Sequence, residues 1–208
     1  MFIEMLFHSP LQFLMICLIL VFSICLHEYC HAWMAYREGD VDAAEYMTLN
    51  PFRQMGIMSL LMMAIIGIAW GAVPVNPSHL RSRRSMLKVS LAGPAANLLL
   101  FLISGIAVFF IGWAGVEQNM LPLLYFALPF GIYNFALLIF NLIPAPGMDG
   151  WNVLAELFPK IRQISSEFAK GAMLAMILLA FIGVRYLFSV GAWLMMLFLN
   201  CGTRFGGA

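Results

Sequence analysis

Long apolar runs separated by short polar segments dominate the hydropathy pattern of the chain. Three of them are each about 23 to 26 residues long, and a helix rises 1.5 Å per residue, so each is long enough to span about 30 Å of hydrocarbon. A fourth run contains Arg185 near its middle. We expect it to form either one span with Arg185 turned inward or two shorter pieces that meet near Gly183. The four runs cover residues 11–36, 88–113, 121–143 and 171–199.

A shorter apolar stretch, residues 55–69, lies between the first two spans and is interrupted by glycines. Residues 70–75 follow it and are expected to be strand-like, because Pro74 and Pro77 prevent helix continuation. Beyond the third span, residues 151–158 are expected to form a short helix that Pro159 stops. The pattern therefore predicts an all-α membrane protein, a polytopic helical bundle of about 4 to 6 transmembrane segments with a short re-entrant or β-hairpin element.

Composition supports this fold class. The 208 residues are 63% hydrophobic and 10% charged, far from the roughly 25% charged residues of soluble domains. The net charge of +1 gives no basic excess, so no nucleic-acid partner is expected. The four cysteines, mostly within apolar runs, are interpreted as small buried hydrophobes. Residues 1–10 carry no Lys or Arg, which argues against a cleavable signal peptide, and we expect residues 1–208 to form one integral-membrane domain.

The positive charges are distributed asymmetrically. Lys and Arg gather in residues 81–88 and 160–170, whereas residues 114–121 contain Glu117 and no Lys or Arg. Cytoplasmic loops are enriched in Lys and Arg, so the first two segments are expected in the cytoplasm and the N-terminus outside. The expected surroundings are a lipid bilayer, with the first and third spans both ending on the cytoplasmic side.

The first apolar run contains the pattern His-Glu-x-x-His at His27, Glu28 and His31. On a helix the two histidines lie one turn apart on the same face, where both imidazoles can reach one cation. Zinc suits imidazole ligands, and Glu28 lies close enough to meet a water on that metal. The alternative is a set of buried, hydrogen-bonded polar groups. Because three ionisable residues in a membrane-length apolar run are costly, we favour a functional metal site.

Two histidines leave zinc short of a protein ligand, and the chain has only three aspartates to complete the set. Asp40 and Asp42 lie in a polar loop; they are interpreted as solvated residues rather than as a second metal site. Asp149 follows a turn that contains Pro144, Pro146 and Gly147 and that can return the chain toward the membrane interior. Asp149 is either the third ligand or a helix N-cap, and the histidine pair favours the ligand.

Three elements, in order, resemble the site-2 protease family of intramembrane zinc metalloproteases: the His-Glu-x-x-His pattern, Gly93-Pro94-Ala95-Ala96-Asn97, and Asn141-x-x-Pro-x-Pro-x-x-Asp149-Gly150. The segments 48–51 and 73–77 also look like parts of this family. The resemblance implies one zinc ion per chain, held by His27, His31 and Asp149, with Glu28 as the catalytic base. It also implies that Asn97 is a polar group near the substrate or intermediate, and that Asn141 is a helper near the Asp149 loop.

The resemblance further implies a compact family member with a catalytic core at about residues 11–158 and C-terminal span or spans at 171–199. Its expected activity is hydrolysis of peptide bonds within or near transmembrane segments of membrane-protein substrates. It would act in a prokaryotic inner membrane, with the active site toward the cytoplasm. Since a helix hides its peptide bonds, the substrate must unwind locally, and the strand-like residues 70–75 are expected to pair with it.

Other classes of membrane protein are weighed against this interpretation. A zinc transporter also places His and Asp in the membrane, but it has no use for Glu28 beside a bound water. A non-catalytic scaffold would usually have lost Glu28 or a ligand. An aspartyl intramembrane protease needs two buried aspartates, whereas Asp40 and Asp42 lie in a polar loop. A rhomboid-like serine protease needs a membrane-buried Ser–His pair, and His8 and His79 lie outside the spans.

Overall fold

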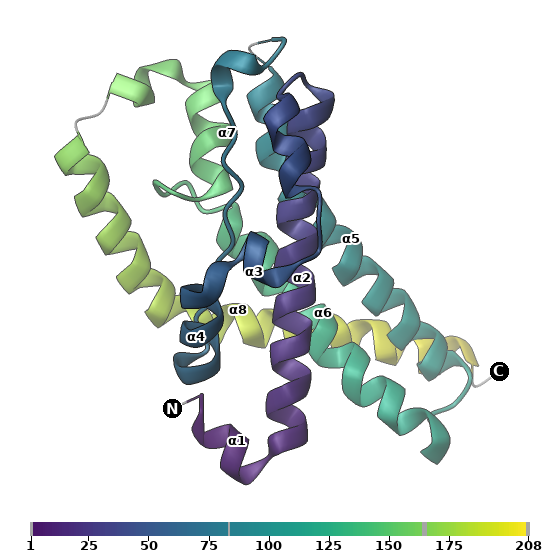
Figure 1. Cartoon of the computed structure of the whole chain (residues 1–208). Coiled ribbons are helices and arrows are strands. Elements are labelled where there is room, and N and C mark those ends of the chain that lie inside the picture. The colour runs from purple at the N-terminus through teal and green to yellow at the C-terminus, as the bar shows by residue number, and fades with distance from the viewer. Residues whose placement is uncertain (1, 83, 164–165, 207–208) are drawn as a thin grey trace.

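The computed structural model describes residues 2–82, 84–163 and 166–206, and every regular element in these ranges is a helix. Figure 1 shows a long vertical helix, α2, surrounded by the others. The α-helices are α1 Glu4–His8, α2 Pro10–Arg37, α3 Pro51–Gln54, α4 Gly56–Ile66, α5 Ser85–Trp113, α6 Leu121–Asn141, α7 Asp149–Leu157 and α8 Ser166–Gly206. Short 3₁₀ turns are η1 Val41–Tyr46, η2 Pro77–His79, η3 Gln118–Met120 and η4 Pro159–Gln163.

Within the described ranges, four helical segments are long and apolar enough to cross a membrane. This agrees with the lower end of the predicted 4 to 6 spans. Three of them match the predicted spans to within a few residues. The first begins with Pro10, whose fixed φ and missing N–H suit the first position of a helix. It ends just before Gly39, which has the positive φ of +118° that favours glycine after a helix. The four segments are Pro10–Arg37, Ser85–Trp113, Gln118–Asn141 and Ile182–Gly206.

Helix α5 is the central helix, since it contacts α2, α6, α7 and α8. Small residues allow this close packing: a Cβ at Gly112 would lie 2.6 Å from the carbonyl oxygen of Leu199 in α8. The outward faces of the long helices expose large apolar side chains, as a surface in contact with lipid does. Examples more than half exposed are Leu11, Leu18, Leu99, Ile106, Leu123 and Trp193.

The segment between α2 and α5 enters alongside α2 and returns to the same end of the molecule (Figure 1). It descends through α3 and α4, turns at Gly67 in a left-handed conformation, and rises again through residues 68–76 as extended chain. Eleven residues give α4 a length of only about 16 Å, so it does not cross a membrane alone. The two ends of this segment lie at the same end of the molecule, an arrangement compatible with the predicted re-entrant element (Figure 1).

The predicted β-hairpin is wrong, because the described residues contain no strand. The rising limb is instead fixed by isolated bonds. The Trp70 N–H donates to Ser59 Oγ at 2.9 Å, the Ala72 N–H donates to the Gln54 carbonyl at 3.1 Å, and the Asn76 N–H donates to the Asp40 carboxylate at 2.8 Å. A single backbone–backbone bond does not make a ladder. The chain therefore keeps an extended segment whose other edge is not paired in a sheet.

Helix α8 also differs from expectation. It has 41 residues, about 61 Å, roughly twice the hydrocarbon thickness, and Figure 1 shows that it changes direction between its halves. Of the part of α8 that was searched for spans, Ile182–Gly206 qualifies as one. Arg185 is exposed and is not turned inward. It lies in the first turn of that span, where a long side chain can extend to the membrane surface, so no buried partner is needed.

The segments rich in Lys and Arg lie at one end of the bundle. The Glu38 carboxylate, just after α2, accepts hydrogen bonds from Lys88 Nζ at 2.7 Å and from Ser85 Oγ at 2.5 Å, which joins α2 to α5. The bond from Lys88 is the main cause of a lowered Glu38 pKa. In Figure 1 the loop before α5 and the start of α8 lie at the top of the view, whereas the α5–α6 connection lies at the lower right. This arrangement is compatible with the charge-based topology.

Candidate metal centre

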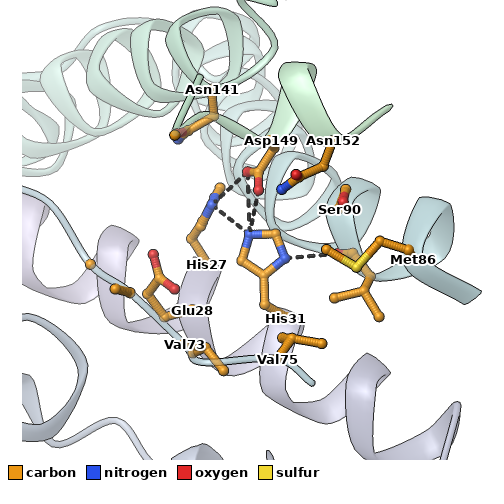
Figure 2. Close-up of a pocket in the computed structure, with 14 residues that line it drawn as sticks. His27, Glu28, His31, Val73, Val75, Met86, Ser90, Asn141, Asp149 and Asn152 are labelled. Carbon is orange, nitrogen blue, oxygen red and sulfur yellow. Dashed lines mark hydrogen bonds and ion pairs between the residues drawn. The ribbon is translucent and has the colours of Figure 1, made fainter. Parts of the chain in front are cut away.

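His27, His31 and Asp149 come from distant parts of the chain and converge in the structure (Figure 2). The two imidazole Nε2 atoms lie 2.9 Å apart. The Asp149 carboxylate lies 3.1 Å from each of them. The three side chains are only 6%, 9% and 15% exposed. Ligands of a tetrahedral zinc at 2.0–2.1 Å are separated by about 3.3 Å, so this group fits one such ion.

The outer hydrogen bonds of both histidines orient their Nε2 atoms for a metal. The His31 Nδ1–H donates to the carbonyl oxygen of Val89 at 2.7 Å, and the His27 Nδ1–H donates to Asn97 Oδ1 at 2.6 Å. Because these oxygens only accept, each neutral ring carries its proton on Nδ1 and its lone pair on Nε2. Two imidazole lone pairs and a carboxylate therefore face one point, where they repel one another unless a cation or a proton lies between them.

The charge state of Asp149 also suits metal binding. Burial raises the pKa of its carboxyl, but hydrogen bonding to His27 and His31 lowers it by more, to about 2. The carboxyl group is therefore anionic at neutral pH, as an oxygen ligand of a metal needs to be. Asp149 opens α7, and the predicted alternative of an N-cap is not observed, because the cap position is Met148 and makes no side-chain capping bond.

Asn97 lies behind His27 and is completely buried. Its Oδ1 accepts from His27, and its Nδ2 donates to Asn134 Oδ1 at 3.1 Å. Asn134 Nδ2 in turn donates to Ser23 Oγ at 3.0 Å. This buried network connects α2, α5 and α6 and fixes the His27 ring. Asn134 belongs to none of the sequence motifs, so the sequence gave no sign of this contact.

Glu28 lies beside the three grouped side chains and lines the same pocket (Figure 2). Its carboxylate lies against Gly71 and interacts with the backbone amide of Val73. A Cβ at position 71 would clash with the Glu28 carboxylate, so glycine is required for this approach. The extended segment that the sequence predicted as strand-like thus forms the wall beside Glu28.

Two further glycines permit close packing, Gly93 at the centre and Gly150 where α7 begins. A Cβ at Gly93 in α5 would clash with the Nε2 atoms of both His27 and His31. A Cβ at Gly150 would clash with the Leu142 carbonyl, so glycine allows α7 to begin against the end of α6. These clashes explain in physical terms why the second and third motifs contain glycine where they do.

The pocket around this centre has a volume of about 290 Å³ and so has room for more than a water molecule, which occupies about 30 Å³. Asn141 lines it at the end of α6, where its Nδ2 donates to the Leu137 carbonyl at 3.0 Å. Sequence reasoning missed four lining residues from α5 and α7: Met86, Val89, Ser90 and Asn152. None of them carried a motif signal.

Asp40, Asp42 and His79 form a second group whose ligand-type atoms also lie within 4.8 Å of one another. His79 Nδ1 lies 3.2 Å from Asp40 and 3.5 Å from Asp42. The sequence did not place His79 beside these aspartates. Asp40 is buried and partnered, whereas the other two side chains are 77% and 42% exposed.

Comparison with known proteins gives several relatives. The chain is 32% identical to "Putative zinc metalloprotease YwhC" of Bacillus subtilis, over 73% of this chain and 71% of that protein. It is also 32% identical to "Putative zinc metalloprotease Rip2" of Mycobacterium tuberculosis strain H37Rv, over 83% of this chain and 69% of that protein. For the Rip2 of Mycolicibacterium smegmatis the identity is 34%, over 64% of this chain and 52% of that protein.

No family model and no solved structure matches the chain. The named relatives, the order of the three motifs, and the grouping of His27, His31 and Asp149 all indicate the same family. The chain belongs to the site-2 protease family of zinc metalloproteases.

Proposed function

We propose that the protein is an intramembrane zinc endopeptidase that hydrolyses peptide bonds within or near transmembrane segments of other membrane proteins. The observation that carries the proposal is the position of Glu28, a buried carboxylate that is not part of the ligand group yet lines the same pocket. The proposal is supported by the relatives named as zinc metalloproteases and by the four candidate spans around the site.

The residues divide the chemistry among them. His27, His31 and Asp149 would hold the zinc, which when bound supplies Lewis acidity and lowers the pKa of water toward 7. Glu28 takes the proton of the attacking water and then passes it to the leaving amine. Asn97 keeps the His27 ring in its orientation through the 2.6 Å bond to Nδ1. Asn141 closes the α6 end of the pocket, next to the turn that carries Asp149.

The extended segment 71–75 is suited to receive an unwound substrate. Its Ala72 N–H is bonded to Gln54, while Gly71, Ala72, Val73 and Val75 line the pocket. An extended peptide bound there gains backbone hydrogen bonds along one edge, in the manner of strand addition. We place the substrate in a bacterial inner membrane and the active site in its cytoplasmic half. The Lys and Arg distribution and the position of the centre near the Arg37 end of α2 support this orientation.

Glu28 also distinguishes this proposal from a zinc transporter or a non-catalytic scaffold. Neither requires a carboxylate beside the metal group, in space that a glycine at position 71 leaves open. A transporter would instead need the ligands to release the ion readily. The enclosed ligands, with less than a sixth of each side chain exposed, fit retention of the metal.

The test uses Glu28→Gln, which keeps the shape of the side chain and removes the proton acceptor. We expect one zinc per chain in both proteins, but at least about 10²- to 10⁴-fold slower cleavage by the variant. Membrane proteins that accumulate uncut in cells carrying Glu28→Gln identify candidate substrates, which purified wild-type protein in lipid should then cleave. Wild-type-like cleavage by Glu28→Gln would overturn the proposal, as would zinc transport into proteoliposomes that does not require Glu28.

A further inference from the structure

The hydroxyl of Ser90 is an unexplained polar group in the pocket. Of the buried side-chain polar atoms in the described part of the chain, only Ser90 Oγ and Gln54 Oε1 have no hydrogen-bond partner. Ser90 is 1% exposed and lines the pocket, with the three ligands and Glu28. A serine in a helix usually donates to the carbonyl four residues earlier, yet Ser90 does not. A buried hydroxyl without a partner is costly, and such exceptions in a native fold call for an explanation.

The backbone at Ser90 is unusual as well. The residue four positions later is Pro94, inside α5, and proline has no N–H to donate to the Ser90 carbonyl. Ser90, Gly93 and Asn97 are spaced by three and four residues and therefore share one face of α5. On this face Asn97 bonds to His27, Gly93 leaves space at the two Nε2 atoms, and Ser90 is the position with an unused polar group.

Asn152 from α7 provides a second polar group on this side of the pocket. It is half-buried, lines the pocket, and its side chain makes no hydrogen bond with the described residues. Ser90 and Asn152 line the same pocket, and in the view of Figure 2 both lie on the other side of His31 from Glu28. Both side chains can donate and accept hydrogen bonds, as the two kinds of group in a peptide backbone require.

An unwound peptide has two edges, and within a membrane each exposed N–H and C=O needs a partner. The extended segment 71–75 can serve only one edge. We infer that Ser90 and Asn152 hydrogen-bond the second backbone edge of the substrate next to the scissile bond, an inference that rests on the proposed endopeptidase function. The pocket therefore selects locally unwound peptide by its backbone, from both sides, and Ser90 is a substrate-contacting residue.

The test separates backbone contacts from metal contacts with two inhibitors of the full-length, zinc-loaded protein. Acetohydroxamate binds the metal alone, whereas a trileucine hydroxamate adds a peptide backbone. We expect Ser90→Ala to weaken trileucine hydroxamate binding by about 3- to 10-fold, the usual value of one neutral hydrogen bond. Acetohydroxamate binding, zinc content and thermal midpoint should not change, because the free protein makes no use of the hydroxyl. Asn152→Ala should behave in the same way.

Ser104→Ala is the matched control. Ser104 is another buried serine of α5, but its Oγ donates to the Ala127 carbonyl at 2.5 Å. This variant should therefore lose stability and bind both hydroxamates normally. Should Ser90→Ala accumulate poorly, Ser90→Cys keeps the shape with a weak donor and must show the same selective loss. Unchanged trileucine hydroxamate binding overturns the inference but leaves the proposed function intact. Equal weakening of both hydroxamates, or a stability loss like that of Ser104→Ala, also overturns it.

Discussion

Two clusters in this molecule contain the same residue types and differ in what surrounds them. His27 and His31 are buried and Asp149 is 15% exposed. The outer nitrogen of each imidazole is bonded to an acceptor, so that the inner atoms all carry lone pairs. In the second cluster, Asp40 accepts the Asn76 N–H, and both ring nitrogens of His79 already have partners, Asp40 and Asn76.

The difference shows that ligand-type atoms within 4.8 Å are not sufficient for a metal centre. In the first cluster the hydrogen bonds leave a point that only a proton or a cation can satisfy. In the second cluster they are used to fasten the loop after α2 to the loop before α5, and solvent reaches Asp42 and His79. We therefore interpret the first cluster as the metal centre and the second as a structural connection between loops.

The largest difference between substitutions in the two clusters should appear in the number of zinc ions bound per chain. Asp149→Ala deletes a ligand and should reduce bound zinc from one per chain to nearly none, with loss of cleavage, as should His27→Ala and His31→Ala. Asp42→Ala is the matched control and should retain one zinc per chain and full activity. Metal analysis of the purified proteins checks this. Two zinc ions per wild-type chain, or full occupancy in Asp149→Ala, would contradict the assignment of the two clusters.

A smaller effect on zinc binding is expected from a substitution of Asn97, which lies behind the first cluster. Asn97→Ala removes the acceptor of the His27 Nδ1–H, so zinc affinity should fall by about 10- to 100-fold, while turnover recovers at saturating zinc. Titration with a zinc buffer, followed by cleavage assays at each occupancy, measures both quantities. Slow turnover by the fully zinc-loaded variant would instead assign Asn97 to substrate or oxyanion contact, the role that the family resemblance implies.

Substitutions in the second cluster should change the stability of the protein and leave its activity unchanged. Asp40→Ala removes the buried carboxylate that accepts from the Asn76 N–H and should lower the free energy of unfolding by about 1–3 kcal/mol, as expected for a hydrogen bond to a charged group. Asp42→Ala, at a 77% exposed side chain, should change it by less than about 0.5 kcal/mol. Thermal melts in detergent compare the two variants. Equal stability of both would mean that the buried carboxylate does not fasten the loops.

The sidedness of the loops should be measurable without any effect on function. With the four native cysteines replaced by alanine, a cysteine at Ser82 should react with an impermeant reagent only from the cytoplasmic side, and one at Glu117 only from the opposite side. The Lys and Arg asymmetry is the reason. Labelling of both positions from one side would contradict the topology. It would mean that the second cluster and the α5–α6 connection lie on the same side of the membrane.

Local chemistry in the sequence was sufficient for much of the fold. Apolar run lengths predicted α2, α5 and α6, because a span must satisfy its own backbone within about 20 residues. The i, i+4 spacing predicted that His27 and His31 share a helix face. The short α7 was also predicted. The residues 70–75 were recognised as extended, but strand pairing depends on a partner at the right distance, and here isolated bonds to Ser59, Gln54 and Asp40 replace it.

Contacts between distant residues were decided only by the tertiary structure. Asp149 lies 118 positions from His31, and no local rule brings them together. The same holds for the path from His27 through Asn97 to Asn134, for His79 beside Asp40, and for the unpartnered hydroxyl of Ser90. The sequence by itself determined the first three spans, the short helix α7 and which residues can bind zinc. Packing of α5 and α7 against α2 decided which of those residues meet, because burial and hydrogen-bond direction arise only when the helices are together.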